Sequence, residues 1–119
     1  KRVIVIDDSI VRGTTSKSRL GQLRKAGAKE IHVRITCPPH RYPCYYGIDF
    51  QKKGELLAAN RTLHEIQQFL NVESLCYLSV EGMMSCATQP QNYFCNACFT
   101  SKYPTPIEEE TKNLSVKKP

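Results

Sequence analysis

The sequence predicts an α/β fold built on a parallel β-sheet, and three observations lead to this prediction. The run from Val3 to Ile6 is apolar and β-branched, which is typical of a buried strand with neighbours on both sides. Residues 30–36 alternate between apolar and polar side chains, which is typical of a second strand. Residues 14–26, between them, have the apolar spacing of a helix. A strand, a helix and a strand in this order form a βαβ unit, with parallel strands and a right-handed crossover.

Each element of this unit carries its own local signals. Thr14 or Thr15 can cap the helix, which we expect to run to about Ala26 with Gly27 as its stop. The inward face of the helix carries two leucines, Leu20 and Leu23. The core face of the second strand carries three aliphatic residues, Ile31, Val33 and Ile35. Its opposite face carries His32 and Arg34.

The next part of the chain predicts a loop and two helices. Residues 37–49 contain three prolines and Gly47, which indicates an irregular loop. Residues 55–59 favour a short helix. Thr62 and Glu65 have the spacing of a capping box and open a longer helix. Its inward residues are Ile66, Phe69 and Leu70.

The last part of the chain predicts a third strand over residues 74–78 and a brief helix from a Ser79 cap to about Cys86. Residues 89–104 are expected to be irregular. We therefore expect a domain over residues 1–86, a cysteine-bearing segment over residues 87–104 and a tail over residues 105–119. The tail includes an acidic triplet, Glu108 to Glu110.

Size and charge narrow the class of protein. The 119 residues, 40% of them apolar, suit one compact domain or part of one. The net charge is +6, and ten of the 17 Lys and Arg residues lie at or before Arg41, against three acidic residues there. This excess favours a polyanion, either a phosphorylated metabolite or a nucleic acid, and a solvated basic surface explains it equally well. No apolar run approaches the roughly 18 residues of a membrane span. Because the chain lacks an initiator Met and opens in a strand, we expect part of a longer protein.

The loop from Asp7 to Thr15 is the strongest functional signal. A loop that leads from a parallel strand into a helix presents backbone N–H groups and the positive end of the helix dipole to an anion. Gly13 lets the backbone approach closely, and the hydroxyls of Ser9, Thr14 and Thr15 add donors. The loop matches neither the Walker pattern nor GxGxxG. It therefore predicts an anion site of another kind.

Asp7 and Asp8 indicate what lies beside the anion. Carboxylates repel phosphate, but they accept hydrogen bonds from vicinal sugar hydroxyls and bind divalent cations. A phosphate on the loop with a ribose diol beside it satisfies both halves, so the sequence predicts a ribose 5-phosphate ligand. The alternative is a strand end with two solvated aspartates. Arg12 either pairs with the phosphate or is solvated.

The string VIVIDDSIVRGTT, residues 3–15, resembles the phosphoribosyl pyrophosphate (PRPP) motif of the type I phosphoribosyltransferases. Later strings make the resemblance more specific: TTSKSRLGQLRKAGAKEIHVRI, PPHRYPCYYGID, LSVEGMM and CNACFTSKYP. Together they are similar to the glutamine PRPP amidotransferase (amidophosphoribosyltransferase) family, from Val3 to about Pro106. The resemblance implies the C-terminal portion of a type I phosphoribosyltransferase fold, which is Rossmann-like, followed by an irregular cysteine-bearing segment.

This resemblance implies an enzyme that joins glutamine-derived ammonia to C1 of PRPP and releases pyrophosphate, the first step of de novo purine biosynthesis. Matching positions imply that Asp7 and Asp8 meet the ribose hydroxyls and help to hold Mg²⁺, with no catalytic nucleophile. The implied PRPP-binding residues are Asp7, Asp8, Ser9, Ile10, Val11, Arg12, Gly13, Thr14 and Thr15.

The resemblance also implies partners and a location. Purine nucleotides would act as feedback inhibitors, and an N-terminal glutaminase domain, absent from these residues, would supply ammonia. The full enzyme would be a homo-oligomer with no DNA or membrane partner, in the cytoplasm, or in a plastid if the source is a plant or alga. The 119 residues alone are expected to be inactive.

The six cysteines suggest a metal centre more than a disulfide scaffold. Cys95 and Cys98 have CxxC spacing, and Cys44 lies in the proline-rich loop. Some members of the resembled family carry a [4Fe–4S] cluster, and the matching positions are Cys44, Cys95 and Cys98, with a fourth ligand outside this chain. A zinc site or plain packing stays open, with His40 as a possible zinc ligand.

The other cysteines and histidines are interpreted without a functional role. We expect three cysteines to be packing residues: Cys37, Cys76 and Cys86. Of these, Cys86 is the reserve candidate for a metal ligand. His32 and His64 are expected at the surface.

Other functions remain open at this point. A base-salvage phosphoribosyltransferase shares the loop but does not need the CNAC segment. A PRPP-sensing regulator that binds DNA suits the basic charge, but no helix-turn-helix pattern is present. A zinc-stabilised interaction module would leave Asp7 and Asp8 without a task.

Overall fold

The architecture is a three-stranded parallel sheet with two helices packed on one face, in a computed structural model that describes residues 1–50 and 52–107. The strands are β1 (Arg2–Asp7), β2 (Glu30–Ile35) and β3 (Ser74–Tyr77), and they pair in the order β1-β2-β3. Both pairs are parallel, with Val5 opposite Val33 and Val33 opposite Leu75. The predicted α/β class and parallel sheet are confirmed.

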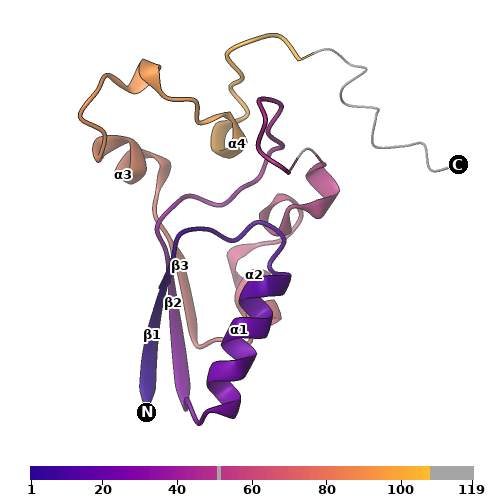
Figure 1. The fold of residues 1–119 in the computed structure, drawn as a ribbon, viewed down its shortest axis with the longest axis vertical. Coiled ribbons are helices and arrows are strands. Elements are labelled where there is room, and N and C mark those ends of the chain that lie inside the picture. Colours follow the sequence, from indigo (N-terminus) through magenta and orange to yellow (C-terminus); the bar gives the residue numbers. More distant parts are fainter. Residues whose placement is uncertain (51, 108–119) are drawn as a thin grey trace, which may run out of the picture.

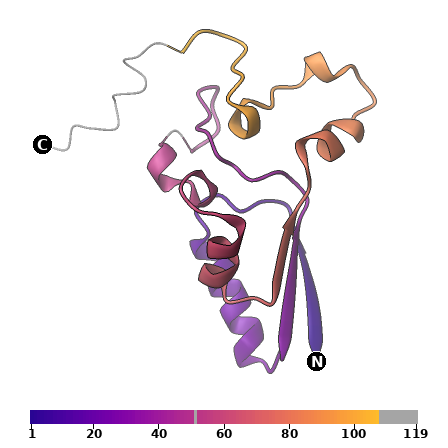
Figure 2. The ribbon, with the colours of Figure 1, turned by 180° about the vertical axis from the view of Figure 1, so that it is seen from behind.

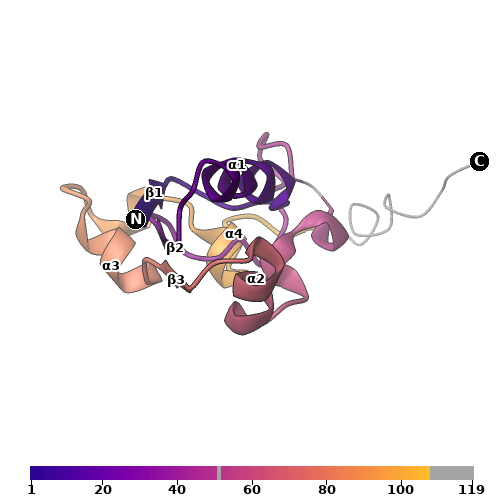
Figure 3. The same ribbon diagram turned by 90° about the horizontal axis from the view of Figure 1, so that it is seen from below.

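Helices α1 (Thr14–Lys25) and α2 (Leu63–Leu70) connect the strands and lie on the same side of the sheet (Figure 1, Figure 3). The core fills the space between these helices and the sheet. Its buried residues are Ile10, Leu20, Ile31, Val33, Ile35, Leu57, Ala58, Ile66, Leu70, Val72 and Leu75. The aliphatic face predicted for the second strand is therefore the core face.

The opposite face of the sheet corrects the prediction for the first strand. Ile4 and Ile6 are 70% and 71% exposed, so the strand is not buried on both faces as its apolar run suggested. Within the described residues β1 pairs with β2 alone, which makes it an edge strand. An apolar run of this length thus predicted the strand correctly and its burial wrongly.

The predicted helix caps are present at α2 but not at α1. The capping box is present, because Thr62 Oγ1 accepts from the Glu65 N–H (3.2 Å) and Glu65 Oε2 accepts from the Thr62 N–H (2.7 Å). Helix α1 instead begins after Gly13, which stands at the cap position with φ 82° and gives no side-chain hydrogen bond. The prediction of a Thr14 or Thr15 cap is therefore wrong, because both threonines already lie inside the helix.

The remaining elements are short. Residues 55–59, predicted as one short helix, form parts of two 3-10 helices, η1 (Lys53–Glu55) and η2 (Leu57–Ala59). Helix α3 (Val80–Ser85) is capped by Ser79, whose Oγ accepts from the Gly82 N–H at 2.9 Å, as predicted. The region expected to be irregular contains η3 (Gln91–Tyr93) and α4 (Ala97–Thr100).

The loop over residues 37–50 and the segment around α4 gather beyond the carboxyl ends of the strands, at the end of the sheet away from the N-terminus (Figure 1, Figure 2). The backbone N–H groups of Arg41 and Tyr42 both donate to the Cys98 carbonyl at 3.1 Å. The Tyr103 hydroxyl donates to the Pro43 carbonyl at 2.8 Å. These bonds bring together segments far apart in sequence, close to the end of the sheet where α/β proteins place their ligands.

No helix among the described residues is long and apolar enough to cross a membrane. Most of the predicted tail over residues 105–119, including its acidic triplet, lies outside the described residues.

Candidate functional site

The loop between β1 and α1 lines a pocket of about 220 Å³ at the carboxyl end of β1. Apart from Ile10, every residue predicted to bind PRPP lines this pocket, and Ser16 and Arg19 of α1 line it as well. The lining residues are Asp7, Asp8, Ser9, Val11, Arg12, Gly13, Thr14, Thr15, Ser16 and Arg19. The structure therefore brings the predicted set together in one place.

Two contacts and one backbone angle fix the shape of the loop. The side chain of Ile10 is 1% exposed and belongs to the core, so Ile10 anchors the loop and leaves only its backbone for a ligand. The Val11 carbonyl accepts from the Leu57 N–H at 2.9 Å, which ties the loop to η2. Gly13 has φ 82°, a left-handed conformation that L side chains rarely adopt.

The backbone of the loop offers a row of free donors. Within residues 1–50 and 52–107, the N–H groups of residues 9–16 have no protein acceptor. The first backbone hydrogen bond of α1 is donated by the Lys17 N–H to the Gly13 carbonyl at 2.9 Å. A helix N-terminus with unpaired donors and an oriented dipole is an anion site. The loop is therefore built to receive a group such as phosphate.

Two carboxylates stand at one side of this pocket. Asp7 ends β1, and its Oδ1 accepts from the Asp8 N–H at 3.0 Å. Asp8 is exposed, and its Oδ1 accepts from the Ser9 hydroxyl at 3.1 Å. Both carboxylates keep oxygens that accept from sugar hydroxyls or bind a divalent cation. The anion-binding loop and the carboxylates thus form two chemically opposite halves of one site.

Arg12 lines the pocket and also has partners in the protein, which neither of its two predicted roles included. Its Nη2 donates to Glu55 Oε2 at 2.8 Å and to the Asp49 carbonyl at 3.2 Å, and its Nε donates to Glu55 Oε2 at 3.2 Å. The ion pair is partly exposed, so it contributes at most about 1 kcal/mol. It nevertheless directs the guanidinium toward η1.

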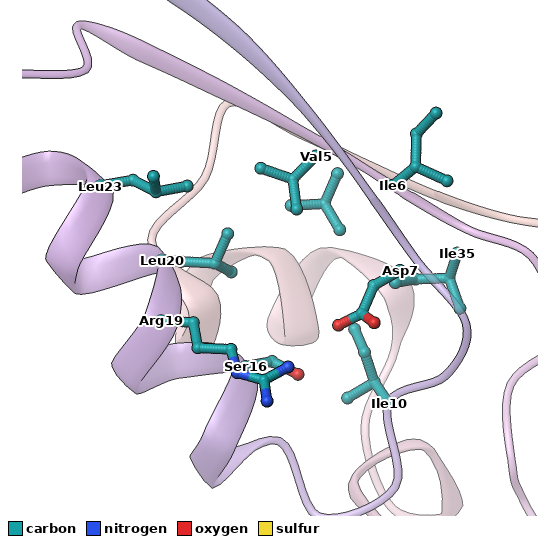
Figure 4. A pocket seen from close by; sticks show the side chains of 10 residues that line it. Val5, Ile6, Asp7, Ile10, Ser16, Arg19, Leu20, Leu23 and Ile35 are labelled. Atoms are coloured by element: carbon teal, nitrogen blue, oxygen red, sulfur yellow. The ribbon is translucent and has the colours of Figure 1, made fainter.

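Ser16 and Arg19 are site residues that the sequence analysis missed. They also line a second cavity of about 170 Å³, between β1 and α1, whose other walls include Leu20 and Leu23 (Figure 4). Figure 4 shows the Asp7 carboxylate and the Arg19 guanidinium directed toward one space, with Ser16 between them. The available signal was helical spacing, since Arg19 lies three residues after Ser16 and four after Thr15.

Comparison with known proteins places this geometry in a family. The chain is 47% identical to the amidophosphoribosyltransferase of Synechocystis sp. over 116 residues, which is 98% of this chain and 23% of the relative. It is 51% identical to the amidophosphoribosyltransferase of Methanocaldococcus jannaschii over 110 residues, 92% of this chain and 23% of the relative. The chain belongs to the amidophosphoribosyltransferase family. No family model matches it.

The solved structures agree with this assignment. One is the glutamine PRPP amidotransferase of Bacillus subtilis complexed with ADP and GMP, with a TM-score of 0.82 and 45% identity over 92% of this chain and 25% of that chain. The other is described as the allosteric regulatory enzyme of purine biosynthesis, with a TM-score of 0.84 and 46% identity over 93% of this chain and 25% of that chain. The chain thus spans about a quarter of the length of the amidophosphoribosyltransferases that it matches.

The three cysteines singled out by the amidophosphoribosyltransferase resemblance lie near one another but form no finished metal site. Cys98 is half-buried, and its pKa is raised to about 11, first by burial and then by the nearby Cys44 and Cys95 thiols. The Tyr46 N–H donates to Cys44 Sγ at 3.4 Å. Within the part of the chain that the structure describes, no group of three or more His, Cys, Asp or Glu side chains could hold a metal ion.

The other three cysteines were all predicted to be packing residues, but only one of them packs against the core. Cys37 packs against the core, as predicted, and its pKa is raised to about 11 by burial, by Cys98 and by Asp8. Cys76 and Cys86 are exposed, so their assignment to packing is wrong. Cys76 pairs with Arg34 on the face of the sheet opposite the core, which no helix among the described residues covers.

The histidines also differ from expectation. His40 is 8% exposed, with its ring 5.0 Å from the Phe50 ring and 4.8 Å from the Phe99 ring between centroids. Its Nδ1 has no partner among the described residues, and burial lowers its pKa. His40 is therefore packed between two aromatic rings. His64 is exposed as expected, but His32 is half-buried, with Nδ1 2.8 Å from Ser74 Oγ.

Proposed function

We propose that this chain forms the ribose 5-phosphate half of the PRPP site in an amidophosphoribosyltransferase. The reaction transfers glutamine-derived ammonia to C1 of PRPP and yields 5-phosphoribosylamine and pyrophosphate, the first step of de novo purine biosynthesis. The observation that carries this proposal is the pocket at the end of β1, which is lined both by residues whose N–H groups have no acceptor among the described residues and by two adjacent carboxylates. The identity to amidophosphoribosyltransferases over nearly the whole chain supports the same reading.

The phosphate half of the site consists of backbone donors and hydroxyls. Residues 9–16 lead into the first turn of α1, their N–H groups have no acceptor among the described residues, and Ser9, Thr14 and Thr15 add hydroxyl donors. The positive end of the helix dipole favours the phosphate dianion. Gly13 keeps side-chain atoms out of the tightest part of the loop. These groups would hold the 5-phosphate and fix the position of the ribose.

The ribose half consists of Asp7 and Asp8. Their carboxylates would accept hydrogen bonds from the two ribose hydroxyls, and they also suit Mg²⁺, which proteins bind through one or two carboxylates together with substrate oxygens. When bound, the ion would neutralise charge on the departing pyrophosphate. The bond from C1 to pyrophosphate breaks through an oxocarbenium-like state, so positioning and charge stabilisation suffice without a protein nucleophile.

The same pocket would accept purine nucleotides. The B. subtilis relative is described as complexed with ADP and GMP, and GMP carries a ribose with a 5′-phosphate. A loop that binds the ribose 5-phosphate part of PRPP presents the same donors to such a nucleotide. Feedback inhibition by competition at this loop follows from that shared chemistry.

The cysteines of this chain fit the ligand chemistry of a [4Fe–4S] cluster, although the described residues hold no complete ligand set. Cys44, Cys95 and Cys98 offer thiols, and the N–H bond to Cys44 Sγ is of the kind that surrounds iron–sulfur ligands. A cluster here would tie the loop over residues 37–50 to α4. Iron and acid-labile sulfide in protein purified without oxygen, lost in Cys98→Ser but retained in the exposed control Cys76→Ser, would support this role.

The direct test of the function uses Asp7→Asn and Asp8→Asn. Each variant should weaken binding of PRPP with Mg²⁺ by roughly tenfold, as expected when one charged hydrogen-bonding group is lost, and should strongly reduce turnover in the complete enzyme. Glu81→Gln on α3 removes the same charge from an exposed position outside the pocket and should leave binding unchanged. Unchanged binding and kinetics in both aspartate variants would rule out the assignment. The 119 residues alone should show no PRPP-dependent synthesis.

A further inference from the structure

Arg19 is the cation best placed to serve the phosphate pocket. It lies on α1, beyond the helix N-terminus, and lines both the loop pocket and the cavity beneath it. Side chains of a helix lean toward its N-terminus, so a long residue covers the turn that precedes it. Arg19 therefore extends over Thr15 and Ser16, whose backbone N–H groups belong to the free donors of the loop.

The two arginines of the pocket differ in what they already bind. Arg12 already uses its Nε and Nη2 donors on Glu55 and on the Asp49 carbonyl, so among the described residues only its Nη1 donors are without an acceptor. Arg19 has no hydrogen bond and no ion pair to any residue within the described ranges 1–50 and 52–107. Its five N–H donors are therefore available, in the fork geometry that matches phosphate.

Asp7 does not neutralise Arg19 in the structure. The two side chains are directed toward the same space, but no ion pair within 4.0 Å joins them (Figure 4). A carboxylate on one wall and a guanidinium on another suit a ligand that carries hydroxyl donors and an anionic group. Ribose 5-phosphate has both, at neighbouring positions.

We propose that Arg19 binds the 5-phosphate of the ligand, together with the backbone donors of the loop. This inference rests on the proposed function, and it assigns the phosphate-binding guanidinium to α1 instead of to Arg12 in the motif itself. Arg19 then closes the open side of the phosphate pocket, and Arg12 holds the loop against η1.

The test is a calorimetric titration of the protein with ribose 5-phosphate in the presence of Mg²⁺. Arg19→Gln should weaken binding by roughly tenfold, the lower end for a charge-assisted hydrogen bond because the side chain is exposed. Arg19→Lys keeps the charge and loses the fork, so its loss should be smaller. Lys25→Gln removes the same charge from an exposed position at the far end of α1, and it should bind like the wild type.

The outcomes separate the two proposals. If the wild type binds and Arg19→Gln binds equally well, the role of Arg19 is wrong and the proposed site stands. If Lys25→Gln weakens binding as much as Arg19→Gln, only the overall positive charge matters and the specific contact is wrong. If the wild type does not bind ribose 5-phosphate, the proposed function fails, and the role of Arg19 fails with it. Matching thermal unfolding midpoints would show that Arg19→Gln folds normally.

Discussion

The α-carbon of Gly13 lies against the side chain of Leu57, so that a Cβ at position 13 would stand 2.6 Å from Leu57 Cδ2. The same Cβ would be 3.1 Å from Cε1 of Phe69. The backbone N–H of Leu57 also binds the Val11 carbonyl. The loop between β1 and α1 is therefore shaped by contact with η2 and α2, elements that lie more than forty residues later in the sequence.

Gly13→Ala should destabilise the protein by about 1–3 kcal/mol and weaken phosphate binding. Two effects lower the stability of this variant. The left-handed φ of 82° is strained for alanine, and the new methyl group collides with Leu57. Thermal unfolding and the ribose 5-phosphate titration measure the two effects.

Gly21 provides the matched control for this substitution. It lies within α1, and a Cβ there would meet nothing within 4 Å. Gly21→Ala should therefore stabilise the protein by roughly 0.5–1 kcal/mol through helix propensity. If both substitutions changed stability in the same direction, the proposed contact between Gly13 and Leu57 would not be what constrains the loop.

His40 should make stability depend on pH below its ordinary pKa. Burial lowers its pKa from the ordinary value of 6.5, so the folded protein resists protonation while the unfolded chain accepts the proton. Stability is therefore present above pH 6.5 and falls as pH decreases from 6.5 toward the lowered pKa of the folded state. The slope for this one group is at most about 1.4 kcal/mol per pH unit. Denaturant titrations between pH 7.5 and about 5.5 measure it.

The control for His40 is a variant that cannot titrate. His40→Leu keeps an apolar side chain between Phe50 and Phe99 and should flatten the stability curve in this pH range. His40→Phe, which fills more of the space, provides a second comparison if leucine packs poorly. An equally steep curve in both variants would assign the pH dependence to other groups.

The parts of this site that the sequence predicts are the ones set by local chemistry. The strand–loop–helix order, the two aspartates at the strand end and the capping box of Thr62 all depend on residues within a few positions of one another. Such signals survive in a single sequence because the backbone groups they satisfy are adjacent. The resemblance of residues 3–15 to a PRPP motif then predicts PRPP as the ligand.

The parts that the sequence does not predict depend on distant contacts. Arg12 is paired with Glu55, 43 residues away, and no local sequence pattern predicts that pair. The exposure of Ile4 and Ile6 depends on which elements cover the sheet, which an apolar run cannot report. The motif over residues 3–15 does not predict Arg19, because the pocket also includes the helix turn that follows the motif.

Thiol labelling should divide the cysteines of the metal-free protein by environment. The pKa of about 11 for both Cys37 and Cys98 leaves about a hundredfold fewer reactive thiolates near neutral pH than the ordinary value of 9.0 would. Both are also half-buried, whereas Cys76 and Cys86 are exposed. At pH 8, iodoacetamide should therefore modify Cys76 and Cys86 first and Cys37 and Cys98 last, as peptide mass spectrometry over time can follow. In denaturant this order should disappear. Rapid labelling of Cys37 or Cys98 in the folded protein would mean that the packing of the loop over residues 37–50 against α4 opens in solution.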